Sequence, residues 1–248
     1  MNGIAMFKST ERAVRPNHAD FYFYVQPLLY TAWAPRLTRD ELVYYLIHCR
    51  GYNPSHGGSL FGAFGCNRWG GLTAARYRKA RQRMEALGLT YTQDLGKQRF
   101  TRVANLADPF RVDQSGEEVV PPDGHVFSDL SSEGLIGIPW SLINGCRELM
   151  KDADWATEAQ VRLASIRTAE AVRVLLWCYH HASPDGHIDS RRLWEEAFEP
   201  AYDPAIPNEL QMTKEQFEAA FEELTEIGLV GINLDREEAS WSVYHALR

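Results

Sequence analysis

Cysteine is scarce in this sequence. The 248 residues include four cysteines, which form no Cys-x-x-Cys pair. They are Cys49, Cys66, Cys146 and Cys178. This wide separation favours reduced thiols inside a cell over a disulfide framework.

Long apolar runs are missing as well. The longest dense apolar stretch, Val172–Tyr179, is interrupted by Arg173 and falls short of the ~18 residues that span a bilayer. Residues 1–12 lack the continuous apolar core and the cleavage pattern of a signal peptide. We therefore expect a soluble, cytoplasmic protein with no membrane partner.

The motifs that carry enzymatic chemistry are also missing. The glycine-rich segment Gly57–Gly62 lacks the Gly-Lys-Ser/Thr ending of a phosphate-binding loop, and no Gly-x-Ser-x-Gly elbow occurs. Two groups of residues have the side chains of metal ligands without the paired spacing of a zinc site. These groups are Cys178, His180 and His181 and, separately, His48, Cys49, His56 and Cys66. We expect no enzymatic activity, no cofactor and no metal site.

The sequence does contain enough apolar and aromatic residues for a folded core. Hydrophobic residues make up 45% of the chain, and its seven Trp, eleven Phe and eleven Tyr exclude disorder over the whole length. The length suits one large domain or two small ones.

Charge is distributed unevenly. The formal net charge is −7, but residues 68–102 hold nine basic and two acidic residues, a net charge of +7. A compact basic patch on an acidic protein indicates one surface directed at a polyanion. A solvated, arginine-rich helix would have the same composition.

Start and stop signals predict helices and hairpins along the chain. Thr38 followed by Glu41 is the capping-box pattern of a helix start, and Gly51 ends that helix. The predicted helices cover residues 38–50, 60–64, 73–87, 140–150, 168–182, 190–198 and 213–227. The predicted strands cover residues 89–92, 99–103, 135–138, 229–234 and 240–246, and residues 20–33 supply a strand or packing arm.

Residues 108–133 differ from the rest in composition. They hold seven acidic residues, one basic residue and the pair Pro121-Pro122, which is typical of a linker. We therefore divide the chain into an N-terminal arm with a first domain at 1–107, the linker, and a second domain at 134–248.

The two halves repeat one another at an offset of 140 residues. Residues 73–89 align without a gap with residues 213–229, and their apolar positions match at spacings of four and three, the buried stripe of an amphipathic helix. In each half, three helices are followed by a two-stranded ribbon, which is the order of elements in a winged helix-turn-helix. The predicted fold class is mostly α with small β-hairpin wings, in two tandem winged-helix domains.

These segments resemble a known family. Residues 73–89 are similar to the recognition helix and first wing strand of bacterial winged-helix DNA-binding proteins, and Gly137–Trp140, Glu170–Tyr179 and Asp185–Ile188 carry related traits. The tandem arrangement resembles plasmid and phage replication initiators or replisome organisers. That resemblance implies origin binding or autoregulation as a repressor, with no catalysis by the domain itself.

The first repeated helix, residues 73–87, carries a basic outward stripe. Arginine can bond to guanine in the major groove, and arginine and lysine both neutralise phosphates. The helix N-terminus at Thr73 also presents backbone N–H groups to an anion. With double-stranded DNA as the partner, the predicted binding residues are Arg68, Thr73, Arg76, Arg78, Lys79, Gln82, Arg83, Lys97, Arg99 and Arg102.

The second repeated helix, residues 213–227, has the opposite charge. It holds one lysine and five glutamates, so a phosphate-lined groove would repel it. We expect it to contact a host protein, a second copy of the chain in a homodimer, or the other half of this chain, although a solvated acidic face would have the same sequence. The predicted protein-binding residues are Glu215, Glu218, Phe221, Glu222 and Glu223.

Two hypotheses about function follow from these surfaces. In the first, the chain is a duplex DNA-binding protein of a mobile element, either a replication initiator or a transcriptional repressor, and uses the basic helix. In the second, the winged-helix scaffold acts through protein–protein contacts as an inhibitor or adaptor of a host nucleoprotein complex, and uses the acidic surfaces.

Overall fold

The structure is a computed structural model of the 248-residue chain. It describes residues 22–53, 57–95, 98–106, 111–112, 118–119, 135–144, 163–182, 187–188, 209–233 and 240–243. The described part is mostly helical with small antiparallel sheets, in agreement with the predicted class. None of its helices has the length and apolar character needed to cross a membrane.

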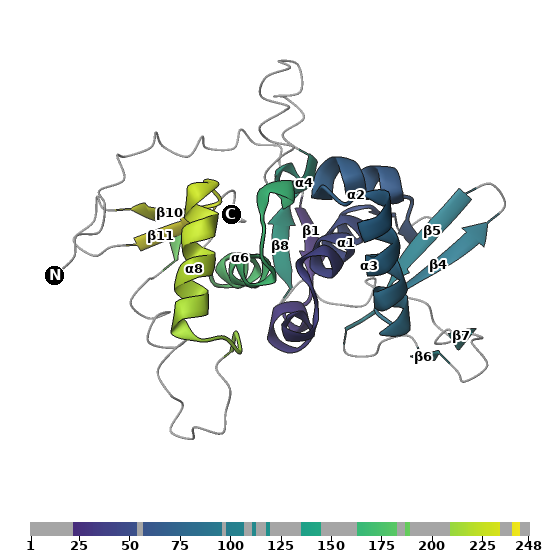
Figure 1. The fold of residues 1–248 in the computed structure, drawn as a ribbon, viewed down its shortest axis with the longest axis horizontal. Coiled ribbons are helices and arrows are strands. Elements are labelled where there is room, and N and C mark those ends of the chain that lie inside the picture. Colours follow the sequence, from purple (N-terminus) through teal and green to yellow (C-terminus); the bar gives the residue numbers. More distant parts are fainter. Residues whose placement is uncertain are drawn as a thin grey trace, which may run out of the picture.

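Three α-helices and one antiparallel sheet follow η2 (Ala34–Arg36) in the described residues of the first half (Figure 1). Helix α1 (Arg39–Arg50) leads into α2 (Ala63–Gly70) and α3 (Ala74–Ala86). The sheet has the order β2-β3-β5-β4, so the second of the two short strands after α1, β3, pairs with the second strand of the hairpin. Its strands are β2 (Tyr52–Asn53), β3 (Gly58–Ser59), β4 (Thr90–Leu95) and β5 (Gln98–Val103).

The described elements of the second half follow the same order at the other end of the molecule (Figure 1). Helix α6 (Ala169–His181) corresponds to α1, and α8 (Lys214–Glu226) corresponds to α3. The sheet order is β10-β11-β9, and again the short strand after the first helix pairs with the second hairpin strand. Its strands are β9 (His187–Ile188), β10 (Val230–Asn233) and β11 (Ser240–Val243). The predicted helix at 190–198 lies outside the described residues.

Helices α3 and α8 begin and end at equivalent residues, as the sequence repeat predicts. The hydroxyls of Thr73 and Thr213 accept a hydrogen bond from the N–H three residues on, which caps each N-terminus. Gly88 and Gly228, just beyond the C-termini, both have a φ of 70°. In each copy the following leucine N–H donates at 2.9 Å to the carbonyl five residues earlier, which ends the helix in the same way.

The turn before each of these helices is repeated too. Gly71 has a φ of 65°, and Gln211, 140 residues later, has a φ of 50°. A non-glycine residue in this left-handed region costs roughly 1 kcal/mol. The Gln211 side chain offsets that cost because its amide donates to the Thr31 carbonyl at 2.6 Å. Leu72 and Met212 follow and are buried beneath their helices.

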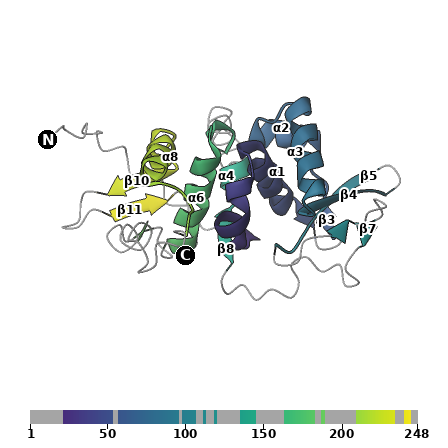
Figure 2. The ribbon, with the colours of Figure 1, turned by 60° about the horizontal axis from the view of Figure 1, so that its bottom comes forward.

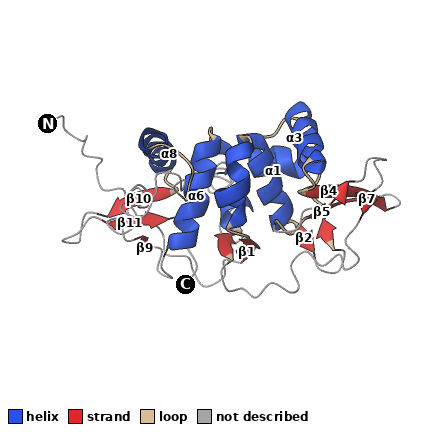
Figure 3. Ribbon diagram, turned by 90° about the horizontal axis from the view of Figure 1, so that it is seen from below, coloured by secondary structure: helices blue, strands red, loops and turns tan. Residues whose placement is uncertain are grey.

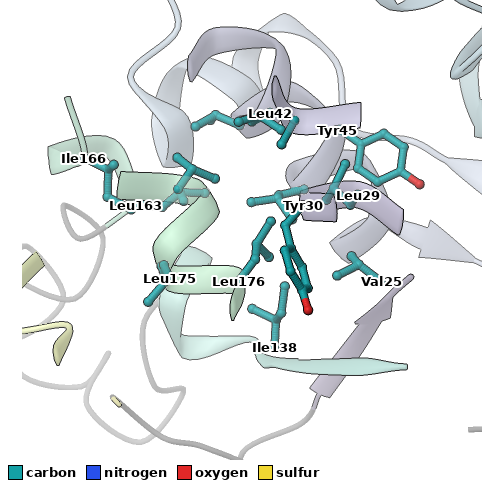
Figure 4. Close-up of a cluster of buried hydrophobic side chains, with 14 of the residues drawn as sticks. Val25, Leu29, Tyr30, Leu42, Tyr45, Ile138, Leu163, Ile166, Leu175 and Leu176 are labelled. Carbon is teal, nitrogen blue, oxygen red and sulfur yellow. The ribbon is translucent and has the colours of Figure 1, made fainter. Parts of the chain in front are cut away.

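The two halves share one core. Strand β1 (Tyr22–Val25) precedes the first half and β8 (Ile136–Pro139) precedes the second, and the two pair antiparallel at the centre of the molecule. Apolar side chains from both halves pack beside this pair, including Tyr30 and Leu42 from the first half and Leu176 from the second (Figure 4). Helices α1 and α6 are in contact there. The two halves therefore form one packed body.

Several elements differ from the predictions. The predicted helix at 60–64 is wrong, because α2 begins only at Ala63 and runs on to Gly70. A side chain at Gly70 would lie 2.5 Å from Val43, so this glycine allows α2 to pack closely on α1. Residues 29–36 form two short helical turns, η1 (Leu29–Trp33) and η2 (Ala34–Arg36), where only a strand or arm was predicted.

Other predicted segments are described only in part. The predicted helix at 140–150 is described as α4 (Ser141–Asn144). In the predicted linker, β6 (Arg111–Val112) pairs with β7 (Glu118–Val119), and the other residues of 108–133 lie outside the described residues. Three of the cysteines are buried free thiols, and Cys146 is not described.

Arg39, the first residue of α1, connects the two halves at the boundary between them, which we call the seam. The residue is 8% exposed, and its guanidinium donates to the Gly70 carbonyl of its own half at 2.9 Å. It also donates to three carbonyls of the second half, those of Leu163, Ala164 and Ile166, at 3.2, 3.0 and 2.8 Å. The Leu163 carbonyl also accepts from the Ile166 N–H at 3.3 Å. One side chain of the first half thus holds three backbone carbonyls of the second.

Replacing Arg39 by methionine should destabilise the chain strongly. We expect the free energy of unfolding in urea to fall by about 3 kcal/mol, because the four hydrogen bonds from the guanidinium to backbone carbonyls would be lost. The matched control is Arg36→Met, at an exposed arginine three residues earlier, which should change stability by less than about 0.5 kcal/mol. Equal stability of the two variants would contradict this role for Arg39.

Candidate nucleic-acid interface

Helix α3 has one buried and one exposed face. Tyr77, Ala80 and Met84 are buried at spacings of three and four residues, and the Tyr77 ring lies 5.6 Å from that of Tyr44 on α1. Because this face packs against the core, the residues between these positions point outward.

The exposed face of α3 is basic. Arg78, Lys79, Gln82 and Arg83 are all exposed. Across the described part of the chain, the three cations among them have no carboxylate partner. Their positive charge is therefore available to an external anion.

Arg76 is placed differently from these three cations. Its Nε donates to Oδ2 of Asp40 on α1 at 2.6 Å, and its Nη2 donates to Oδ1 of the same carboxylate. Partial burial alone would raise the pKa of Asp40, but the hydrogen bonds and positive charges of Arg76 and Arg39 together outweigh it and hold that pKa below its usual value. The Arg76 side chain is still 47% exposed. Arg76 therefore anchors α3 to α1 of the same half.

The remaining predicted DNA-binding residues lie around α3. The Thr73 hydroxyl caps the helix, and Arg68 is exposed on α2. The β4–β5 hairpin adjoins α3 (Figure 1), with Arg99 exposed and Arg102 half-buried on β5. Lys97, at the predicted hairpin tip, lies outside the described residues.

The outward face of α8 is acidic, as the sequence predicts. Glu215, Glu218 and Glu222 are exposed, and Lys214 lies 3.9 Å from Glu218 in an exposed ion pair. Phe221 is half-buried and packs against the core, with its ring stacked 5.8 Å from that of Phe217. Phe221 therefore contributes mainly to internal packing.

Glu223 does not belong to the acidic surface, and its assignment as a protein-binding residue is wrong. It is 5% exposed. Its carboxylate accepts from the Arg167 N–H and, at 2.8 Å, from the Thr168 hydroxyl at the start of α6. In α1, the Glu41 carboxylate accepts from the N–H of the cap residue Thr38, whereas the equivalent position in α6 is Ala171. The Thr168 hydroxyl caps α6 by accepting from the Ala171 N–H, and the Glu223 carboxylate of α8 holds that hydroxyl in place.

Two side chains that shape this interface were not predicted from the sequence. Asp40 positions Arg76, and Arg39 beside it holds the seam. Both belong to the first turn of α1. An acidic residue such as Asp40 is ordinary there, and nothing in the neighbouring sequence shows that Arg39 is buried.

Comparison with known proteins finds no matching family model, no matching curated protein and no matching solved structure.

Removing the Glu223 carboxylate should destabilise the fold. We expect Glu223→Ala to lower the free energy of unfolding by about 1–2 kcal/mol, because the Arg167 N–H and the Thr168 hydroxyl would lose their acceptor. Glu222→Ala, one residue earlier and exposed, should change it by less than about 0.5 kcal/mol. Chemical denaturation measures the free energy of unfolding of both variants. Similar losses in the two would argue against this structural role for Glu223.

Proposed function

We propose that the two halves are tandem winged helices and that the first half binds duplex DNA through α3 and the β4–β5 hairpin. The order of elements supports the winged-helix assignment. Helix α1, the short strands β2 and β3, helices α2 and α3 and a hairpin follow one another in the first half, and β3 pairs with the second hairpin strand. The second half has the same strand order around α6 and α8.

The observation that carries the DNA-binding proposal is the exposed basic face of α3. Arg78, Lys79 and Arg83 point away from the core without carboxylate partners among the described residues. A helix of about 10–12 Å diameter fits the major groove, where arginine can bond to guanine and both cation types can contact phosphates. The capped N-terminus of α3 adds a positive helix-dipole end on the same element.

The hairpin adds cations next to this helix. Arg99 and Arg102 lie on β5, and the paired strand β4 follows α3 directly through Gly88. A hairpin beside a groove-binding helix would lie over the neighbouring phosphates, where these cations can neutralise charge. Together with the three cations of α3, the first half then offers about five phosphate contacts.

The second half has the wrong charge for this role. The exposed glutamates of α8 would repel a phosphate backbone. We assign this surface to contact with a protein, either a host protein or a second copy of the chain. The resemblance to plasmid and phage replication initiators favours a replication initiator or repressor of a mobile element as the biological role.

A second candidate function rests on the same acidic surface. Glu218 and Glu222 are exposed one turn apart on α8, and an acidic helix can occupy a site built for nucleic acid. In this alternative the chain is an inhibitor or adaptor of a host nucleoprotein complex. Its activity would then depend on these glutamates and not on the cations of α3.

Duplex binding should show the salt dependence of about five phosphate contacts. We expect the slope of log affinity against log salt concentration to be about −4 to −5. The double variant Lys79→Ala with Arg83→Ala should reduce the magnitude of that slope by about 2, because two neutralised phosphates are lost. Fluorescence anisotropy with a labelled duplex, such as the chain's own upstream region, measures both quantities.

The matched control is Arg167→Ala. Arg167 is 68% exposed and pairs with Glu226 on α8, so its loss should leave the slope unchanged. The DNA-binding proposal fails if the wild-type chain binds no duplex in a salt-sensitive manner. It fails equally if the Arg167 variant loses as much affinity as the double variant.

A further inference from the structure

Five polar and aromatic side chains gather where the first half meets the end of α6. Tyr30 comes from η1, Trp177, His180 and His181 come from α6, and Glu209 precedes α8. One ligand atom from each of His180, His181 and Glu209 lies within 4.8 Å of the other two. The group lies outside the α3 surface and has no part in the proposed DNA binding.

Glu209 is at the centre of the group. Its Oε2 accepts from the Trp177 indole N–H at 3.1 Å and lies 3.2 Å from Nε2 of His181. Its Oε1 accepts from the Tyr30 hydroxyl, which also lies 2.7 Å from Nδ1 of His180. Tyr30 and Trp177 therefore hold the carboxylate and one imidazole in place from outside, as the outer partners of metal ligands do.

The distance between two of the ligand atoms matches a small divalent cation. Zinc binds imidazole nitrogen and carboxylate oxygen at about 2.0–2.2 Å in a tetrahedron, which places two such ligand atoms roughly 3.3–3.5 Å apart. The His181 Nε2 to Glu209 Oε2 distance of 3.2 Å is close to that value. The His181 and Glu209 side chains are 26% and 37% exposed, so an ion can enter from solvent.

We propose that His180, His181 and Glu209 bind one zinc ion. Two imidazoles and one carboxylate suit zinc and leave a fourth position for water. The sequence alone predicts no metal site here, because the two adjacent histidines lack a second spaced ligand pair. The fold supplies Glu209, 28 residues from His181, whereas Cys178 of the same segment is fully buried in the core.

The ion would tie three parts of the chain together. It would join the end of α6 to the residue that leads into α8 and, through the hydrogen bonds of Tyr30, to the first half. A ligand that binds only the folded state raises its stability. Zinc should therefore raise the unfolding temperature of the full chain.

Isothermal titration of the untagged, chelator-treated full chain with zinc chloride tests this proposal. We expect one equivalent of zinc to bind and the midpoint of thermal unfolding to rise. His181→Ala and Glu209→Gln should abolish both effects, and the glutamine keeps the size of the side chain if the alanine variant fails to fold. Tyr30→Phe keeps all three ligands and should weaken the affinity by about tenfold.

Glu222→Gln is the matched control, because it removes an exposed carboxylate from α8 and should leave zinc binding unchanged. Absence of zinc binding to the wild-type chain would overturn the proposal and leave the group as a hydrogen-bond network. Zinc binding that persists at full stoichiometry in both ligand variants would overturn it as well, because the ion would then lie elsewhere. Neither result bears on DNA binding by α3.

Discussion

Two consecutive residues at the start of α1, Arg39 and Asp40, bond this helix to α2, to α3 and to the second half. The Arg39 guanidinium bonds to the end of α2 and to three carbonyls of the second half. Asp40, the next residue, bonds to Arg76 and thereby holds α3. Burying a guanidinium is costly unless its donors are satisfied, so this arrangement tolerates little movement between the halves. The position of the candidate DNA-binding helix is therefore coupled to the seam between the two repeats.

The two repeats keep one scaffold but carry opposite surfaces. Figures 2 and 3 show α3 and α8 on the same side of the molecule, with their sheets toward opposite ends. The buried apolar positions of the two helices match, whereas Arg78 and Gln82 in α3 correspond to Glu218 and Glu222 in α8. Core packing limits the apolar positions, and the outward positions remain free to change. One repeat can therefore offer positive charge to a nucleic acid while the other offers negative charge to a different partner.

Local features of the fold could be predicted from the sequence, and contacts between distant segments could not. The caps at Thr38, Thr73 and Thr213 and the bounds of α3 and α8 agree with prediction to within a residue or two, because they depend on neighbouring residues. The β1–β8 pair joins segments more than 100 residues apart, and nothing in either strand specifies the partner. The burial of Glu223 was missed for the same reason, since its position on α8 resembles that of the exposed Arg83 until α6 is placed against it.

The central claim is that α3, and not its twin α8, faces the nucleic acid. Hydroxyl-radical footprinting of the protein side chains, with and without a duplex, tests that claim most directly. The account predicts that oxidation of Arg78, Lys79 and Arg83 decreases in the complex, while oxidation of Phe221 on α8 is unchanged. Protection of α8 with no change on α3 would contradict it.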